Sequence, residues 1–203
     1  ATPVGELAAL GTAACWTASS LAFAAAAQRL GSLALNLIRL VIAFGFLTLT
    51  CWIRRGLALP VDATPEAWGW LSVSGLVGFV VGDLCLFRAL VLIGPRLSML
   101  IMSLAPPVAA ALGWAWLGES LNAADLAGMA VTLAGVAWVV IERQPAQAGD
   151  EPARRPSLPG VGMAVVGAIG QGLGLVISKV GMGGDDPVAA TQIRVLAGIA
   201  GSR

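Results

Sequence analysis

The sequence predicts an all-α integral membrane protein built from packed apolar helices. Of its 203 residues, 58% are hydrophobic and 11% are charged, and the mean hydropathy is +0.86. A soluble domain has about 25% charged residues, so this chain carries too few charges to cover a water-facing surface. The apolar residues also fall into long runs of the length that a membrane helix needs. Together these observations argue against an ordinary soluble domain.

Six apolar runs are long enough to cross a bilayer, because its hydrocarbon core of about 30 Å requires about 20 helical residues. A seventh run begins near Pro187, and we expect it to be cut off at Arg203. The chain is therefore expected to hold about six and a half spans of a longer protein. The six runs are Leu7–Ala27, Leu33–Ile53, Ala67–Ile93, Leu97–Leu117, Ala123–Ile141 and Leu158–Val180.

Local signals mark the breaks and bends of these helices. Asn122 and Asp125 have the spacing of a capping box at the start of the fifth span. Pro106 and Pro107 are expected to kink the fourth span, because proline removes backbone donors. The polar segment 142–157, ERQPAQAGDEPARRPS, has the composition of a linker. We expect it to lie outside the bilayer, with residues 1–141 forming one five-span repeat and residues 158–203 beginning a second.

The two groups of spans resemble each other when the numbering is shifted by 155. Ile38 and Arg39 then coincide with Ile193 and Arg194, and an arginine within a span is rare. Because five is an odd number, the second copy must enter the membrane from the opposite side, so we expect Arg194 to lie toward the opposite face from Arg39. Such inverted repeats are typical of secondary transporters, with the substrate between the halves. The other matched pairs are Gly5/Gly160, Ala9/Ala164, Ala13/Ala168 and Ala34/Ala189.

These features are similar to one known family. Residues 82–140 contain Ala89-Leu90 in the third span, the Pro106-Pro107 pair, a Gly118-Glu119 turn, and Gly128 and Gly135 in the fifth span. This pattern resembles the EamA-type repeat of the drug/metabolite transporter superfamily, and Arg39, Lys179 and Arg194 also fit it. The resemblance implies ten spans in two inverted five-helix repeats, and transport of metabolites, amino acids or toxic compounds. It also implies a multi-pass protein of the cell membrane, here a bacterial inner membrane.

The orientation in the membrane stays open. The resemblance implies a cytoplasmic N-terminus, whereas the distribution of arginines in the loops argues for the reverse.

Asp83 is the most informative candidate residue. It lies about 4–5 Å from the middle of the third span at a rise of 1.5 Å per residue, where a charge must be paired or hydrated. Arg39 is its best partner by depth. Three interpretations stay open: a structural ion pair with Arg39, a proton or substrate site, and an unpaired protonated acid.

Three further residues are candidates for substrate binding. Arg88 either extends to the interface or faces a cavity with Arg39 and Asp83. In the second case the cavity would favour an anionic or zwitterionic ligand. Trp16 and Gln171 occupy matched positions near mid-membrane, and Gln171 should face protein or water. An interhelical hydrogen bond from Gln171 is the alternative to a role in binding.

The sequence favours a secondary transporter that moves a small polar or amphipathic metabolite, amino acid-like or drug-like, by alternating access. Besides the lipid bilayer, the candidate partners are the substrate, a coupled proton and a second copy of the chain. No histidine or tyrosine is present and the net charge is +1, so no cofactor, metal, enzymatic activity or nucleic acid is expected. The alternative is a non-transporting scaffold or partner subunit. A cavity that reaches Asp83 would distinguish the two.

Overall fold

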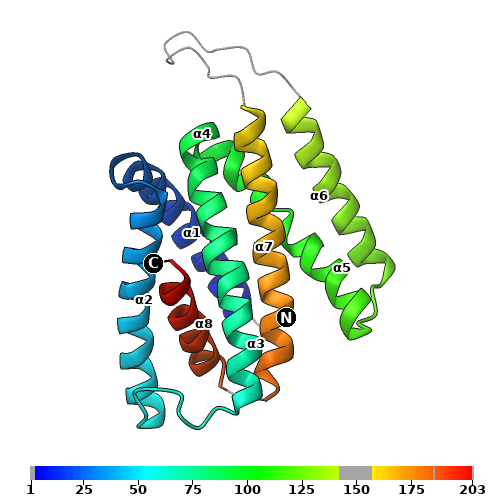
Figure 1. Cartoon of the computed structure of the whole chain (residues 1–203). Coiled ribbons are helices and arrows are strands. Elements are labelled where there is room, and N and C mark those ends of the chain that lie inside the picture. Colours follow the sequence, from blue (N-terminus) through cyan, green and yellow to red (C-terminus); the bar gives the residue numbers. More distant parts are fainter. Residues whose placement is uncertain (1–2, 142–156, 185, 203) are drawn as a thin grey trace.

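The computed structural model describes residues 3–141, 157–184 and 186–202, in which every regular element is a helix (Figure 1). The all-α prediction is confirmed. The linker expected at 142–157 falls almost wholly outside the described residues. In chain order the elements are α1 (Pro3–Leu30), α2 (Ser32–Arg55), α3 (Pro65–Gly75), the π-helix η1 (Leu76–Gly82), α4 (Asp83–Met102), α5 (Ala105–Leu117), α6 (Ala123–Ile141), α7 (Leu158–Met182) and α8 (Pro187–Gly201).

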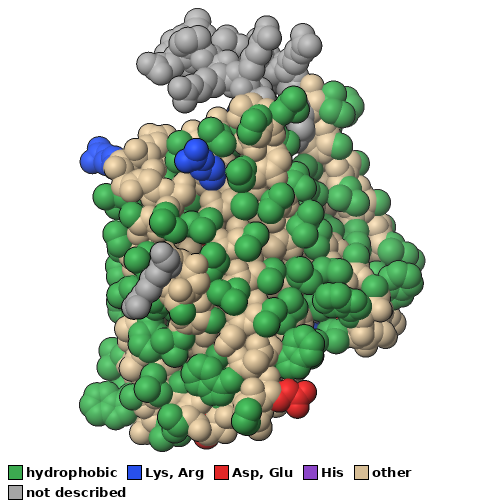
Figure 2. Space-filling view, in the orientation of Figure 1, with side chains coloured by type: hydrophobic (Ala, Val, Ile, Leu, Met, Phe, Trp, Pro, Cys, Tyr) green, Lys and Arg blue, Asp and Glu red, His purple; other side chains and the backbone are tan. Residues whose placement is uncertain are grey.

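Four helical segments are long and apolar enough to cross a membrane by length and composition: Leu10–Leu30, Ser32–Arg55, Pro65–Met102 and Leu158–Met182. Their outward side chains include Phe46, Trp52 and Ile53, each at least 63% exposed. The face drawn in Figure 2 is apolar over most of its height, and its visible charged side chains gather toward the two ends. This distribution suits a bundle surrounded by lipid, because a charge in the hydrocarbon layer is costly.

The fourth predicted span, Leu97–Leu117, is not one continuous helix. Gly94 has φ 78° and kinks α4, which then continues to Met102. The regular helix ends at Met102 and resumes as α5 at Ala105, and Ser103 and Leu104 form a turn between them whose backbone stays right-handed. Pro106 lies in the first turn of α5, where a missing backbone N–H costs little. The proline pair therefore breaks the span, as its missing donors predict.

Polar side chains cap the N-terminal ends of two helices. Asn122 Oδ1 accepts from the backbone N–H groups of Ala124 (2.8 Å) and Asp125 (3.0 Å), and Asp125 Oδ2 accepts from the N–H of Asn122 (2.9 Å). The predicted capping box is therefore confirmed. Thr64 caps α3 in a similar way by accepting from the N–H of Ala67 at 3.2 Å.

Helix α7 lies at the centre of the bundle and packs along α3, η1, α4 and α5. Glycines on both sides permit this approach. A Cβ added to Gly170 would lie 3.0 Å from Cα of Gly82, and one added to Gly174 would lie 3.0 Å from Cα of Gly78. Small residues spaced four apart allow helix backbones to approach closely in membranes. This contact carries the second part of the chain into the interior of the first.

The helices at matched positions run in opposite directions. Figure 1 shows α1 and α7 antiparallel in the bundle, and likewise α2 and α8. The helices that carry Arg39 and Arg194 therefore run in opposite directions, as an inverted repeat requires. Both guanidinium groups nevertheless reach the same aromatic ring, that of Phe79.

Helix α8 is held against α3 by the absence of a side chain at Gly75, where an added Cβ would collide with the backbone carbonyl of Arg194. We predict that Gly75→Ala lowers the free energy of unfolding by about 1–3 kcal/mol, because rigid backbone must shift. Gly69 lies in the same helix with nothing within 4 Å of an added Cβ, so Gly69→Ala should be neutral or slightly stabilising. Thermal unfolding of the purified protein measures both. Equal melting temperatures for the two variants would contradict this packing.

Candidate functional site

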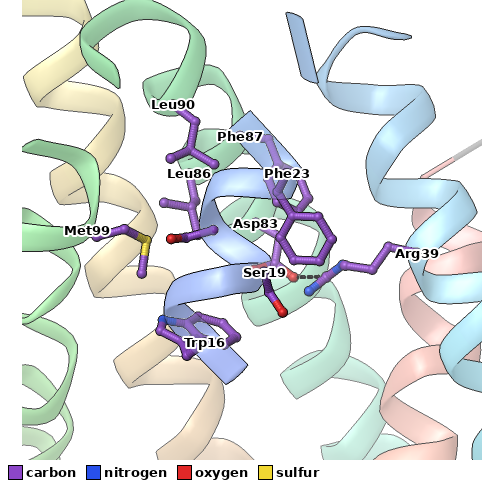
Figure 3. A pocket seen from close by; sticks show the side chains of 10 residues that line it. Trp16, Ser19, Phe23, Arg39, Asp83, Leu86, Phe87, Leu90 and Met99 are labelled. Carbon is purple, nitrogen blue, oxygen red and sulfur yellow. Dashed lines mark hydrogen bonds and ion pairs between the residues drawn. The ribbon is translucent and has the colours of Figure 1, made fainter. Parts of the chain in front are cut away.

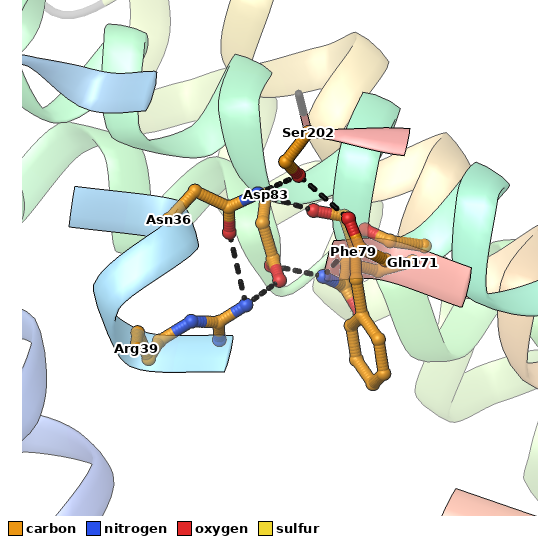
Figure 4. Close-up of polar contacts among 8 residues, drawn as sticks. Asn36, Arg39, Phe79, Asp83, Gln171 and Ser202 are labelled. Carbon is orange, nitrogen blue, oxygen red and sulfur yellow. Dashed lines mark hydrogen bonds and ion pairs between the residues drawn. The ribbon is translucent and has the colours of Figure 1, made fainter. Parts of the chain in front are cut away.

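The candidate site is organised around the Asp83 carboxylate, at the junction of η1 and α4 (Figure 4). Asp83 is 2% exposed and forms an ion pair with Nη2 of Arg39 from α2. Its other oxygen accepts a hydrogen bond from Nε2 of Gln171 on α7. The pairing expected from depth is therefore confirmed, and Gln171 faces protein as its polarity requires.

The π-helix before Asp83 supplies two further acceptors. Such π-helical turns often occur at functional sites. The carbonyl of Gly78 accepts from Gln171 Nε2 at 3.3 Å, and the carbonyl of Phe79 accepts from Asn36 Nδ2 at 2.8 Å. Asn36 Oδ1 in turn accepts from Arg39 Nη2 at 3.2 Å. One polar network therefore joins α2, η1, α4 and α7 inside the bundle.

Aromatic rings surround the Arg39 guanidinium. Its central carbon lies 5.3 Å from the ring centroid of Phe87 and 5.9 Å from that of Phe79. Phe23 from α1 packs edge-on against Phe87, with centroids 5.5 Å apart. A cation beside aromatic faces is stabilised by the ring quadrupole, and more so where water is excluded. These rings therefore help to keep a charged arginine in an apolar interior.

Two adjoining cavities lead to this network. The inner one has a free volume of about 10 Å³, the space of about one water molecule. Its lining includes Arg39, Asp83 and Trp16, and Figure 3 shows the side chains around it. The outer one is an open cleft of about 630 Å³ between α1, α4, α5 and α7. The two share the lining residues Trp16, Ser20 and Met99.

The lining of the cleft is amphipathic. Trp16, Leu21, Met99, Met102, Pro95 and Pro106 supply apolar surface, whereas Thr17, Ser20, Arg96, Ser103 and Gln171 supply polar groups. A volume of about 300–1,000 Å³ with mainly apolar walls and a few polar groups is typical of small-molecule sites. Trp16 and Gln171, matched between the two groups of spans, both line this cleft.

Ion pairs join the two parts of the chain toward the other end of the bundle. Arg55 at the end of α2 pairs with Asp62, and its Nε lies 3.8 Å from a carboxylate oxygen of Asp186 at the start of α8. Lys179 near the end of α7 pairs with Glu119 in the turn after α5. The cleft instead extends to Pro95 and Arg96, beside the kink in α4.

The structure brings together four of the five predicted site residues: Asp83, Arg39, Gln171 and Trp16. It does not bring Arg88 to them, because that side chain is exposed on α4 and lines neither cavity. Sequence reasoning missed Asn36 and Phe79. Asn36 lies one helical turn before Arg39, and that spacing was an available signal. The carbonyl of Phe79 had no such signal, because a π-helix cannot be read from this sequence.

We predict that the Arg39–Asp83 pair behaves as a coupled buried pair. Asp83→Asn and Arg39→Gln should each lower the free energy of unfolding by about 3–5 kcal/mol, since each leaves an uncompensated buried group. The double variant should recover part of the combined loss. Equilibrium unfolding of the four proteins in one detergent measures this.

The pair formed by Arg55 and Asp62 is the matched control, because Asp62 is 48% exposed. The interaction energy between Arg55 and Asp62 in the same kind of double-variant comparison should be about 0–1 kcal/mol, as for exposed pairs. Additive losses at Arg39 and Asp83 would contradict a direct interaction in the folded protein.

Comparison with known proteins identifies the chain. The model of the EamA-like transporter family matches residues 3–141, which is more than half of the 203 residues. No curated protein and no solved structure matches the chain. The matched region contains α1 to α6, and with them Arg39, Asp83, Trp16 and most of the cleft lining. The chain belongs to the EamA-like transporter family, and so to the drug/metabolite transporter superfamily of multi-pass membrane proteins.

Proposed function

We propose that this protein is a secondary transporter that moves a small polar or amphipathic metabolite across the cell membrane by alternating access. The observation that carries the proposal is the open cleft that adjoins the inner cavity at Asp83 and shares Trp16, Ser20 and Met99 with it. A substrate can place its apolar body against Trp16 and the methionines while its polar end points toward the buried network. A purely structural scaffold has no need for such a cleft.

Arg39 is the side chain that we assign to the polar end of the substrate. Its Nη2 is engaged by Asp83 and Asn36. Its Nε is buried without a hydrogen-bond partner in the described part of the chain. Guanidinium groups bind carboxylates and phosphates through several parallel N–H donors. An anionic or zwitterionic substrate therefore suits this site better than a cation.

Asp83 has a positioning role in this proposal. Its carboxylate is held by Arg39 and Gln171, so it fixes the direction in which the guanidinium points. It is also the one carboxyl group that is fully buried among the described residues, which makes it our candidate carrier for a coupled proton. A substrate amine would have to displace one of its two donors in order to reach it.

Transport by the full-length protein in vesicles, screened against amino acids, nucleosides and amphipathic drugs, tests the function. We predict that Arg39→Gln lowers the transport rate of the substrate so found at least tenfold, because a guanidinium contact is lost. Arg88→Gln, an identical change on the exposed surface, should leave the rate unchanged. Measurement with and without a proton gradient shows whether a proton is coupled.

Two outcomes would contradict the proposal. One is the absence of transport for the whole screen in either direction by folded, monodisperse protein. The other is an equal effect of the Arg39 and Arg88 variants. Arg39→Lys is the control for misfolding. It keeps a buried cation but lacks the planar, multi-donor geometry of arginine.

A further inference from the structure

Arg194 is a second arginine in the interior of the bundle, at the position that matches Arg39. Its helix packs tightly against α3 at this point, because the backbone of Arg194 lies where a side chain on Gly75 would be. The guanidinium then extends along η1, where Nη2 lies 3.4 Å from the position that a Cβ on Gly78 would occupy. The side chain is only partly exposed.

No carboxylate is paired with Arg194 among the described residues. The Asp83 oxygens accept hydrogen bonds from Arg39 and Gln171. Arg194 Nε is buried and has no hydrogen-bond partner within the part of the chain that the structure describes. The contact that remains is with the ring of Phe79, 4.7 Å from the guanidinium carbon to the centroid. The local balance is therefore two cations to one anion.

This arrangement suits the capture of an anion. The contact with the Phe79 ring is not a hydrogen bond, so the N–H donors of the guanidinium can still bind a carboxylate or phosphate. A buried cation without a partner is costly in a membrane protein, and such residues usually face a ligand pathway. The excess positive charge makes the binding of one anionic group favourable.

The positions of the two arginines connect this feature with the proposed substrate site. Arg39 and Arg194 approach the same ring at 5.9 Å and 4.7 Å, so their guanidinium carbons are at most about 11 Å apart. They come from α2 and α8, which run in opposite directions (Figure 1).

We propose that Arg194 is a second anion-binding residue of the site, and that Arg39 and Arg194 together receive the oxyanion group of the transported compound. This inference rests on the proposed function for the identity of the site. It goes further by naming the substrate class, a carboxylate or phosphate, and a residue that contacts it. Phe79 is the common surface on which both arginines are held.

Binding of simple probes to the purified full-length protein tests this assignment. Benzoate supplies a carboxylate on an apolar ring, benzamide is its neutral counterpart, and inorganic phosphate is the third probe. We expect benzoate or phosphate to raise the melting temperature in a concentration-dependent way. Arg194→Gln should weaken that binding at least tenfold, and Arg194→Lys should weaken it less. Arg88→Gln should bind like the unmodified protein, and any affinity for benzamide should be the same in all variants.

The outcomes separate this inference from the proposed function. If Arg194→Gln and Arg194→Lys both keep full affinity while Arg39→Gln loses it, the role of Arg194 is overturned and that of Arg39 stands. If neither anion binds the unmodified protein, the anionic substrate class is overturned, whereas transport itself is judged by the vesicle screen. If Arg194→Gln loses affinity for benzoate and keeps its affinity for phosphate, the oxyanion bound by Arg194 is a carboxylate. If it loses affinity for phosphate alone, the oxyanion is a phosphate.

Discussion

A carboxylate inside an apolar helix bundle requires donors, and the way in which Asp83 obtains them governs the rest of this structure. One donor comes from Arg39 on α2 and the other from Gln171 on α7, so three helices must meet at one point. The contact of Gly78 and Gly82 with the glycines of α7 brings the backbones close enough for the short Gln171 side chain to reach. The close packing and the polar network therefore depend on each other.

The same constraint explains why a cavity ends at this network. The cleft has mainly apolar walls, and the buried Arg39 and Asp83 line the smaller cavity beside it. The ion pairs of Arg55 and Lys179 hold the first part of the chain to the second toward the other end of the bundle. The Lys179–Glu119 pair is exposed, at 63% and 38%, and exposed pairs contribute about 0–1 kcal/mol.

Much of the fold could be predicted from the sequence, because membrane helices are set by length and apolarity. The Asn122–Asp125 cap and the break at Pro106 followed from local chemistry. The Arg39–Asp83 pair followed from the depth of two rare charges in neighbouring spans. The hydrogen bonds to the carbonyls of Gly78 and Phe79 could not be predicted, because the π-helix that contains them has no signal in the sequence. The exposure of Arg88 depended on the rotation of α4, which depth alone cannot supply.

The central claim is that water and solutes reach the polar network through the cleft, and cysteine accessibility tests it most directly. Cys15, Cys51 and Cys85 would be replaced, and Ser20→Cys introduced where the two cavities meet. Phe46→Cys, on the outward face of α2 and 69% exposed, is the lipid-facing control. In sealed vesicles a membrane-impermeant maleimide should label Ser20→Cys from one side and Phe46→Cys from neither. If Ser20→Cys is labelled from neither side and is fully labelled after denaturation, the claim is contradicted.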